Sequence, residues 1–220
     1  MLSVSNSYFP GILKAAYGWY DYEISFQAKM SSNVPDERQN ISFVVRSENS
    51  LNGILFQISK ENFNPFLLYN ETLIFDEERS SHLRTVLRPD VWIPVKIIVK
   101  GNNVDISVDN YHVEYRIVTK VFNAVENNLL VRGSAPTLRQ IVDSNTRIQT
   151  MQSEIISKVT GIDSIVNEEE KRTAWAEVSA DIAKIPPSTR VILEYQKGSV
   201  GFRQADVENT FFRNLTVKRI

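Results

Sequence analysis

The chain has 220 residues, enough to bury a sizeable core in one domain or in one domain that carries a large excursion. Its 25 lysines and arginines against 26 aspartates and glutamates give a formal net charge of −1, so no strong field draws the surface to nucleic acid or anionic lipid. The absence of cysteine excludes disulfides, thiolate metal sites and a cysteine nucleophile, but it leaves the compartment open.

The first residues contain no basic leader, and Pro10 interrupts their short apolar content. The sequence therefore predicts neither a signal peptide nor a membrane-spanning helix. The localisation stays unknown, although we favour a virion, an appendage or an extracellular surface over the cytoplasm.

Residues 20–30 alternate between apolar and polar side chains, which is the period of a strand with one buried face. The positions predicted to be buried share one parity: Tyr20, Tyr22, Ile24, Phe26, Ala28 and Met30. Residues 41–45 and 54–58 repeat the alternation on either side of turn-forming residues, and they predict a hairpin.

Two turns in residues 92–118 predict the same buried face. A turn at residues 101–102 brings six aliphatic residues together on one side of the sheet: Val95, Ile97, Val99, Val104, Ile106 and Val108. A second turn at residues 109–110 sets Tyr111, Val113 and Tyr115 opposite the last three of them. Because the two turns agree, the sequence predicts a three-stranded antiparallel meander.

From Pro136 onward the hydrophobic period changes to that of a helix. Two series with a seven-residue repeat form a candidate interface, either between subunits or with a second helix: Ile141, Asn145, Ile148, Gln152, Ile155, Val159 and Ile162. The polar members resemble the seams of trimeric phage-fibre and adhesin stalks, where such residues fix register and strand number.

A second helix is predicted after the acidic residues 168–170, and Pro186 and Pro187 stop it. Its apolar residues Trp175, Val178 and Ile182 recur at helical spacing. The alternative to a coiled-coil arm between subunits is therefore an internal helical hairpin, in which these three residues pack on the first helix.

The segments before and after the helices share an order of motifs. A tryptophan opens a strand, glycine and aspartate turns follow, and the chain closes on a glycine-containing strand that leads to a Phe-x-Asn-Leu strand. The matching positions are Trp92, Gly101, Asp109, Gly198, Gly201, Phe202, Phe212, Asn214 and Leu215. This order resembles the concanavalin A-like, laminin-G-like sandwich superfamily, particularly its bacterial sugar-binding and glycoside-hydrolase-associated members.

The resemblance implies a mainly β fold: an antiparallel β-sandwich of the jelly-roll, concanavalin A-like type with an inserted α-helical hairpin or coiled-coil arm. We place the sandwich at residues 1–135 and 187–220 and the helical insertion at residues 136–186. The resemblance also implies that Trp92 belongs to the core and that the first and last strands of the sandwich are neighbours. It specifies no single activity, because this architecture hosts lectins, hydrolases, adhesive repeats and capsid parts.

Hydrolases of this fold need two carboxylates, and Asp21 and Glu23 are the candidates because they share one strand face. A polar outward face is the reading of them that we favour. The acidic residues 76–78 predict a solvated loop. His82 and His112, the only histidines, are assigned to the surface, so we predict no metal site and no cofactor, with calcium left open.

Tyr17, Trp19 and Tyr20 cluster at the entry to the first long strand, and exposed aromatic rings are the surfaces on which sugar rings stack. They are the candidate ligand-binding residues, with a packed sandwich edge or an interface as the alternative. Trp19 has outward parity relative to Tyr20.

The leading hypothesis is a non-catalytic recognition or assembly module. It binds a glycan or a cell surface, or it docks in an oligomeric virion, phage-tail or adhesin structure as a homo-oligomer or with a partner protein. The competing hypothesis is a divergent polysaccharide hydrolase of the concanavalin A-like fold. Neither hypothesis involves nucleic acid or membrane insertion.

Overall fold

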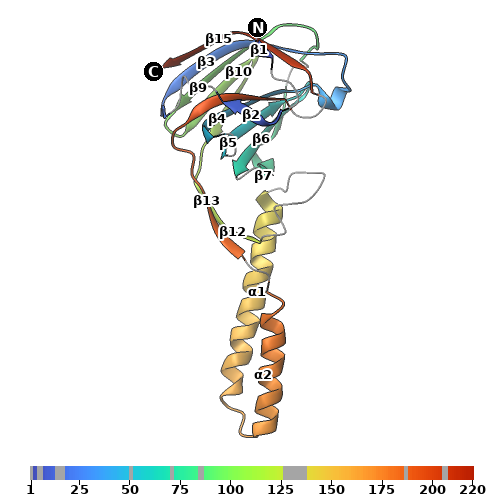
Figure 1. Ribbon diagram of the computed structural model, residues 1–220, viewed down its shortest axis with the longest axis vertical. Helices are drawn as coiled ribbons and strands as arrows, with labels where there is room; N and C mark the ends of the chain where they lie inside the picture. Colours follow the sequence, from blue (N-terminus) through green and yellow to red (C-terminus); the bar gives the residue numbers. More distant parts are fainter. Residues whose placement is uncertain are drawn as a thin grey trace. The chain divides into compact units, whose positions relative to one another are not determined.

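The computed structural model describes residues 2–3, 7–12, 18–49, 52–69, 72–83, 87–125, 138–185, 188–204 and 208–220. The chain forms two compact units, one of Met1–Lys120 with Leu193–Ile220 and the other of Val121–Ile192 (Figure 1). The second unit is longer than the predicted excursion of residues 136–186. It is longer because strands β12 (Lys120–Val125) and β13 (Ser188–Leu193) pair with each other at the base of the helices.

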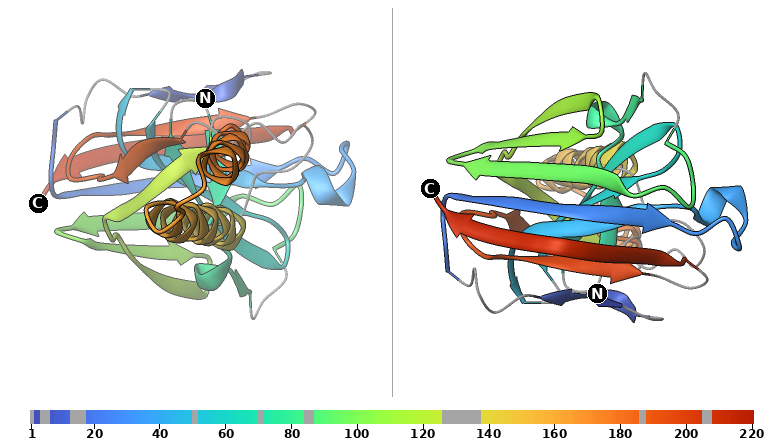
Figure 2. Two further views of the ribbon diagram at one scale, coloured as in Figure 1. Left: turned by 90° about the horizontal axis from the view of Figure 1, so that it is seen from below. Right: turned by 90° about the horizontal axis from the view of Figure 1, so that it is seen from above.

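The first unit contains two antiparallel sheets. The six-stranded sheet has the order β1 (Leu2–Ser3), β15 (Thr210–Arg219), β3 (Tyr22–Met30), β9 (Ile93–Lys100), β10 (Asn103–Val108) and β11 (Tyr111–Arg116). The right-hand view of Figure 2 shows this sheet face-on. The second sheet has the order β2 (Ser7–Ile12), β14 (Ser199–Gln204), β4 (Ile41–Asn49), β5 (Asn52–Ile58), β6 (Asn62–Tyr69) and β7 (Thr72–Phe75), and β8 (Ser81–His82) also pairs with β6.

Aromatic side chains join the two sheets face to face. The Phe26 ring on β3 lies with its centroid 5.0 Å from that of Phe202 on β14 and 6.1 Å from that of Phe43 on β4. Phe56 on β5 and Tyr115 on β11 make a second contact between the sheets at 5.1 Å. Large buried rings in edge-to-face contact contribute much of the stability of such a core. The predicted antiparallel β-sandwich is confirmed.

The register predicted for the meander is confirmed residue by residue, and the predicted hairpin is confirmed as a pair of antiparallel strands. In the meander, Val104 pairs with Val99 on one side and with Tyr115 on the other. In the predicted hairpin, Phe43 pairs with Phe56. The buried parity of the first long strand also holds from Tyr22 to Met30.

The prediction that Tyr20 is buried is wrong, since the residue is 54% exposed. The reason is that β3 begins only at Tyr22, and residues 20–21 form a bend before it. The alternating pattern therefore extended further along the sequence than the ladder of hydrogen bonds.

The closing segment completes the sandwich, as expected. The register of β14 against β4 shifts between Ser199 and Gly201. The register of β15 against β3 shifts between Arg213 and Thr216, and Asn214 lies there in the left-handed region with φ 53°. β15 pairs with both β1 and β3, so the last strand neighbours the first ones.

The second unit contains helices α1 (Leu138–Ile162) and α2 (Glu168–Ile182). The side chain of Asn167 caps α2 by accepting hydrogen bonds from the backbone N–H groups of Glu169 and Glu170. Neither described helix is long and apolar enough to cross a membrane.

Candidate functional site

The outer face of the six-stranded sheet carries the polar side chains of its strands, because the alternate residues face the core. The pairing of neighbouring strands arranges these side chains in rows across the sheet. One row runs through Lys218, Glu23, Ile98, Asp105 and Glu114. Neighbouring strands are about 5 Å apart, so residues in a row are close enough to bind one ligand together.

Two cations lie over two aromatic rings at one end of this face. We call Lys29, Trp92, Phe211 and Arg213 the cationic–aromatic cluster. The Arg213 guanidinium lies 3.9 Å from the centroid of the Trp92 ring. The Lys29 ammonium lies 5.2 Å from the centroids of both Trp92 and Phe211. These distances are within the roughly 6 Å over which a cation is attracted to an aromatic face.

The expectation that Trp92 belongs to the core is wrong. Trp92 is only half-buried, and it lies just before β9, whose first residue Ile93 faces the core. Because side chains alternate along an extended segment, Trp92 faces outward. It contributes its indole ring to the cationic–aromatic cluster instead of to the sandwich interior.

The side-chain amide of Gln27 holds the arginine of this cluster. Arg213 Nε donates a hydrogen bond of 2.8 Å to Gln27 Oε1, and Asn214 Nδ2 donates one of 3.2 Å to the same oxygen. Among the described residues, no carboxylate forms an ion pair with Lys29 or Arg213. The outer N–H groups of Arg213 are therefore available to an external acceptor.

The two candidate catalytic carboxylates have separate environments. Glu23 lies in ion pairs with Lys218 at 2.9 Å and with Lys96 at 3.2 Å. The hydrogen bond from Lys218, aided by Lys96, lowers the pKa of Glu23. Asp21 accepts a hydrogen bond of 2.8 Å from the backbone N–H of Gly101.

Asp21 also lies 3.8 Å from a buried arginine, Arg46, which joins three segments of the first unit. The Arg46 guanidinium donates to the carbonyl of Gly101 at 2.7 Å and to the carbonyl of Gln196. The Tyr22 hydroxyl accepts a hydrogen bond from the Arg46 backbone N–H at 2.9 Å, and burial raises the pKa of Tyr22 to about 12. Asp21 is therefore part of a structural network at this end of the sandwich.

The predicted aromatic platform is only partly within the described residues. Tyr17 lies outside them, Trp19 is half-buried and Tyr20 is exposed. The Trp19 carbonyl accepts a hydrogen bond of 3.2 Å from Gly198. A ligand-binding role for the three aromatic residues stays a prediction.

The acidic loop contains a buried carboxylate that the sequence did not indicate. Asp76 is fully buried, whereas the prediction was a solvated loop. It accepts hydrogen bonds from the Tyr115 hydroxyl at 2.9 Å and from Arg79 at 2.8 Å. Burial raises the pKa of Tyr115, and the adjacent Asp76 charge raises it further, so the hydroxyl stays a proton donor. The cause of the error is tertiary: Tyr115, 39 residues away, covers this carboxylate.

The helix pair buries part of the predicted heptad seam. Ile155 and Ile162 of α1 pack with Val178 of α2 in one cluster. In the internal-hairpin alternative Trp175 and Ile182 also pack on α1, but neither belongs to this cluster, and the two residues are 44% and 53% exposed. Of the other seam residues, Ile148 is buried, Val159 is half-buried and Gln152 is exposed, while the side chains of Ile141 and Asn145 lie outside the described residues.

One ion pair, between Lys158 of α1 and Asp181 of α2, joins the same two helices. Asp181 accepts hydrogen bonds from Lys158 on α1 at 2.5 Å and from Lys184 at 2.7 Å. These bonds lower the pKa of Asp181 to about 2. Because the folded-state pKa is depressed, their contribution to stability is present above the unfolded pKa of about 3.9 and is lost as the pH falls toward 2.

The fold and this surface define a two-sheet antiparallel sandwich with a polar outer face. No protein-family model and no curated protein matches the sequence. Among solved structures, a carbohydrate-binding module, CBM66 from Bacillus subtilis, has a TM-score of 0.49 and 9% identity over 94% of this chain and 79% of that chain.

Two further solved structures are less similar. Chicken galectin 2 has a TM-score of 0.38 and 8% identity over 49% of this chain and 78% of its own. The family 7 alginate lyase A1-II′ has a TM-score of 0.40 and 7% identity over 99% of this chain and 75% of its own. Likenesses this distant carry no argument about the function of this chain.

Proposed function

We propose that the sandwich is a non-catalytic recognition module that binds an acidic glycan, at a virion, an appendage or an extracellular surface. The observation that carries the proposal is the cationic–aromatic cluster. A guanidinium held against an indole presents its N–H groups outward, and paired N–H donors match a carboxylate or a sulfate. The neighbouring amides of Gln27 and Asn214 are suited to sugar hydroxyls, since an amide both donates and accepts.

The environment of the two candidate carboxylates favours binding over hydrolysis. A glycosidase acid is protonated near neutral pH, which requires a raised pKa. The pKa of Glu23 is lowered by Lys218 and Lys96, and Asp21 is engaged by Gly101 and Arg46. The resemblance to the concanavalin A-like, laminin-G-like superfamily is part of the proposal and is compatible with either role.

The test is binding of the full chain to an array of neutral, uronate-containing, sialylated and sulfated glycans. We expect binding that is confined to the acidic members. Trp92→Ala and Arg213→Ala should each weaken the affinity about tenfold or more, because each removes part of the contact to the ligand or its support. The matched control is Arg116→Ala, an exposed arginine on β11 at the far edge of the same sheet, which should leave the affinity within about twofold.

Binding to neutral and acidic glycans alike, or binding that survives in Arg213→Ala, would contradict the proposal. Turnover of a polysaccharide that disappears in Glu23→Gln or Asp21→Asn would establish the hydrolase alternative instead.

A second candidate function is assembly through the helices, because apolar side chains remain exposed there. Ile156 is 66% exposed, and Trp175 and Ile182 lie seven residues apart on one face of α2. Exposed apolar groups on one face are typical of interaction surfaces. Light scattering of the full chain should then give a mass above that of a monomer, and Trp175→Glu should return it to the monomer. A monomeric mass for the unmodified chain would argue against assembly.

A further inference from the structure

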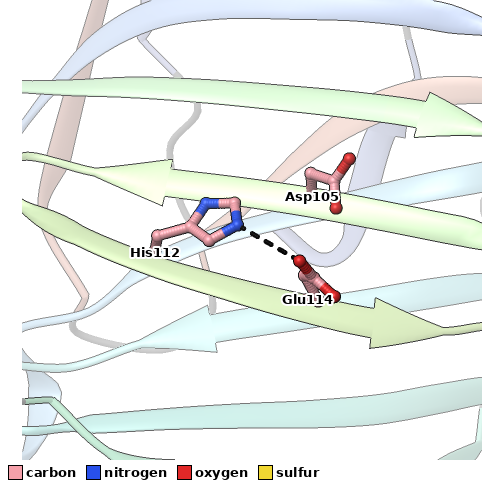
Figure 3. Close-up of side chains that lie close together, drawn as sticks. All are labelled: Asp105, His112 and Glu114. Carbon is pink, nitrogen blue, oxygen red and sulfur yellow. Dashed lines mark ion pairs between the residues drawn. The ribbon is translucent and has the colours of Figure 1, made fainter.

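The hairpin β10–β11 brings three metal-ligating side chains together on the outer face of the six-stranded sheet (Figure 3). Asp105 lies on β10, and His112 and Glu114 lie two residues apart on β11. Each offers a ligand atom, and these atoms all lie within 4.8 Å of one another. Two of these atoms, His112 Nε2 and Glu114 Oε1, lie 3.8 Å apart.

The strand register forces two negative charges into direct opposition. Asp105 and Glu114 are cross-strand partners, and like charges at such positions destabilise a sheet. Among the described residues, neither carboxylate forms an ion pair with a lysine or an arginine. On β9, Lys96 lies in an ion pair with Glu23. A bound cation would relieve the repulsion that this register imposes.

The second ring nitrogen of His112 has a partner that fixes the ring. His112 Nδ1 lies 3.3 Å from Ser107 Oγ, and Ser107 is the residue directly opposite on β10. When Nδ1 donates its proton to this hydroxyl, the lone pair of Nε2 faces Glu114. Metal-binding histidines are oriented in the same way, by a hydrogen bond from the nitrogen that does not bind the metal.

We propose that Asp105, His112 and Glu114 bind a divalent transition-metal ion such as Zn²⁺, with water completing the coordination. One imidazole and two carboxylates suit Zn²⁺ better than Ca²⁺ or Mg²⁺, which prefer oxygen ligands alone. Ligands of a tetrahedral Zn²⁺ at about 2.1 Å lie about 3.4 Å from one another. The 3.8 Å between Nε2 and Oε1 closes to that value by a small rotation of side chains that are 55% and 79% exposed.

The sequence contains the turn and the residues that form this site, although we predicted no metal site from the sequence. The turn at residues 109–110 fixes the register, and that register places Asp105 opposite Glu114 and Ser107 opposite His112. Glu114 lies two residues from His112 on the same strand, and only the register of the hairpin adds Asp105 and Ser107. The inference is independent of glycan binding.

The experiment is a calorimetric titration of the full chain, prepared without a polyhistidine tag, with ZnCl₂. We expect one Zn²⁺ per chain, with the affinity lost or at least about a hundredfold weaker in His112→Ala and about tenfold weaker in Ser107→Ala. His82→Ala is the matched control, since His82 is an exposed histidine on β8 of the other sheet, and its affinity should be unchanged. CaCl₂ should give no comparable binding.

A second measurement identifies which histidine binds Zn²⁺, so that the test does not depend on the affinity alone. In two-dimensional NMR spectra, Zn²⁺ should shift the ring signals of His112 and leave those of His82 in place. Unchanged affinity in His112→Ala, Zn²⁺ shifts at His82 alone, or equal binding of Ca²⁺ and Zn²⁺ would each overturn the proposal. The three substituted side chains, those of His82, Ser107 and His112, are exposed or partly exposed, so the variants should fold as the unmodified chain does.

Discussion

The substitution Gly198→Ala should lower the free energy of unfolding of the sandwich by about 3 kcal/mol. A Cβ at this position would lie 2.6 Å from the backbone carbonyl carbons of Arg46 and Ser47 and from the Ser47 nitrogen. Backbone atoms do not yield as the end of a flexible side chain does. Gly198 also has φ 141°, a conformation that residues with a Cβ rarely adopt. Urea unfolding followed by circular dichroism measures the loss.

Gly101→Ala separates the steric clash from the cost of the dihedral angle. Gly101 has φ 54°, but a Cβ there would meet no atom within 4 Å. Its substitution should cost only the roughly 1–2 kcal/mol of a left-handed residue. If Gly198→Ala lowers the free energy of unfolding no more than Gly101→Ala does, a steric clash with Arg46 and Ser47 is not the cause of the loss.

Asp76→Ala should also destabilise the sandwich by about 3 kcal/mol. The substitution leaves the buried Tyr115 hydroxyl without its acceptor, which costs about 1–3 kcal/mol. It also removes the partner of Arg79, whose side chain is 27% exposed and is therefore partly solvated without the ion pair. The same urea titration measures the effect, and Glu78→Ala is the matched control because Glu78 is an exposed acid two residues away.

A double-mutant cycle tests the pairing itself. Tyr115→Phe removes only the hydroxyl and should cost about 1–2 kcal/mol. Because Asp76 and Tyr115 share one hydrogen bond, the double variant should lose less than the sum of the two single losses, by at least about 0.5 kcal/mol. Additive losses would show that the hydrogen bond does not stabilise the fold. If Glu78→Ala lowers the free energy of unfolding by more than about 0.5 kcal/mol, the negative charge of the whole loop stabilises the fold, and the effect is not specific to Asp76.

The strand pattern of the sandwich was predictable because it is encoded over short distances. The meander was predicted pair by pair, since two short turns and a period of two leave only one register in which the apolar residues share a face. The register of β15 against β3 shifts beside Asn214, where Phe212 and Leu215 break strict alternation. The helices likewise follow from their hydrophobic period.

The candidate binding surface was not predictable in the same way. Lys29, Trp92 and Arg213 come from three segments that are adjacent only because β15 and β9 both pair with β3. No local pattern specifies which strands become neighbours in a sheet. The family resemblance pointed in the opposite direction, since it implied that Trp92 belonged to the core.

The sequence by itself determined the first long strand, the hairpin, the meander with its register and the two helices, because these depend on residues a few positions apart. Only the tertiary structure decided that Asp76 is buried under Tyr115, that Trp92 lies beneath Arg213 and that Arg46 joins Asp21, Gly101 and Gln196. These contacts join residues tens to more than a hundred positions apart. They form only when the order of the strands brings those segments together, and period and spacing do not encode that order.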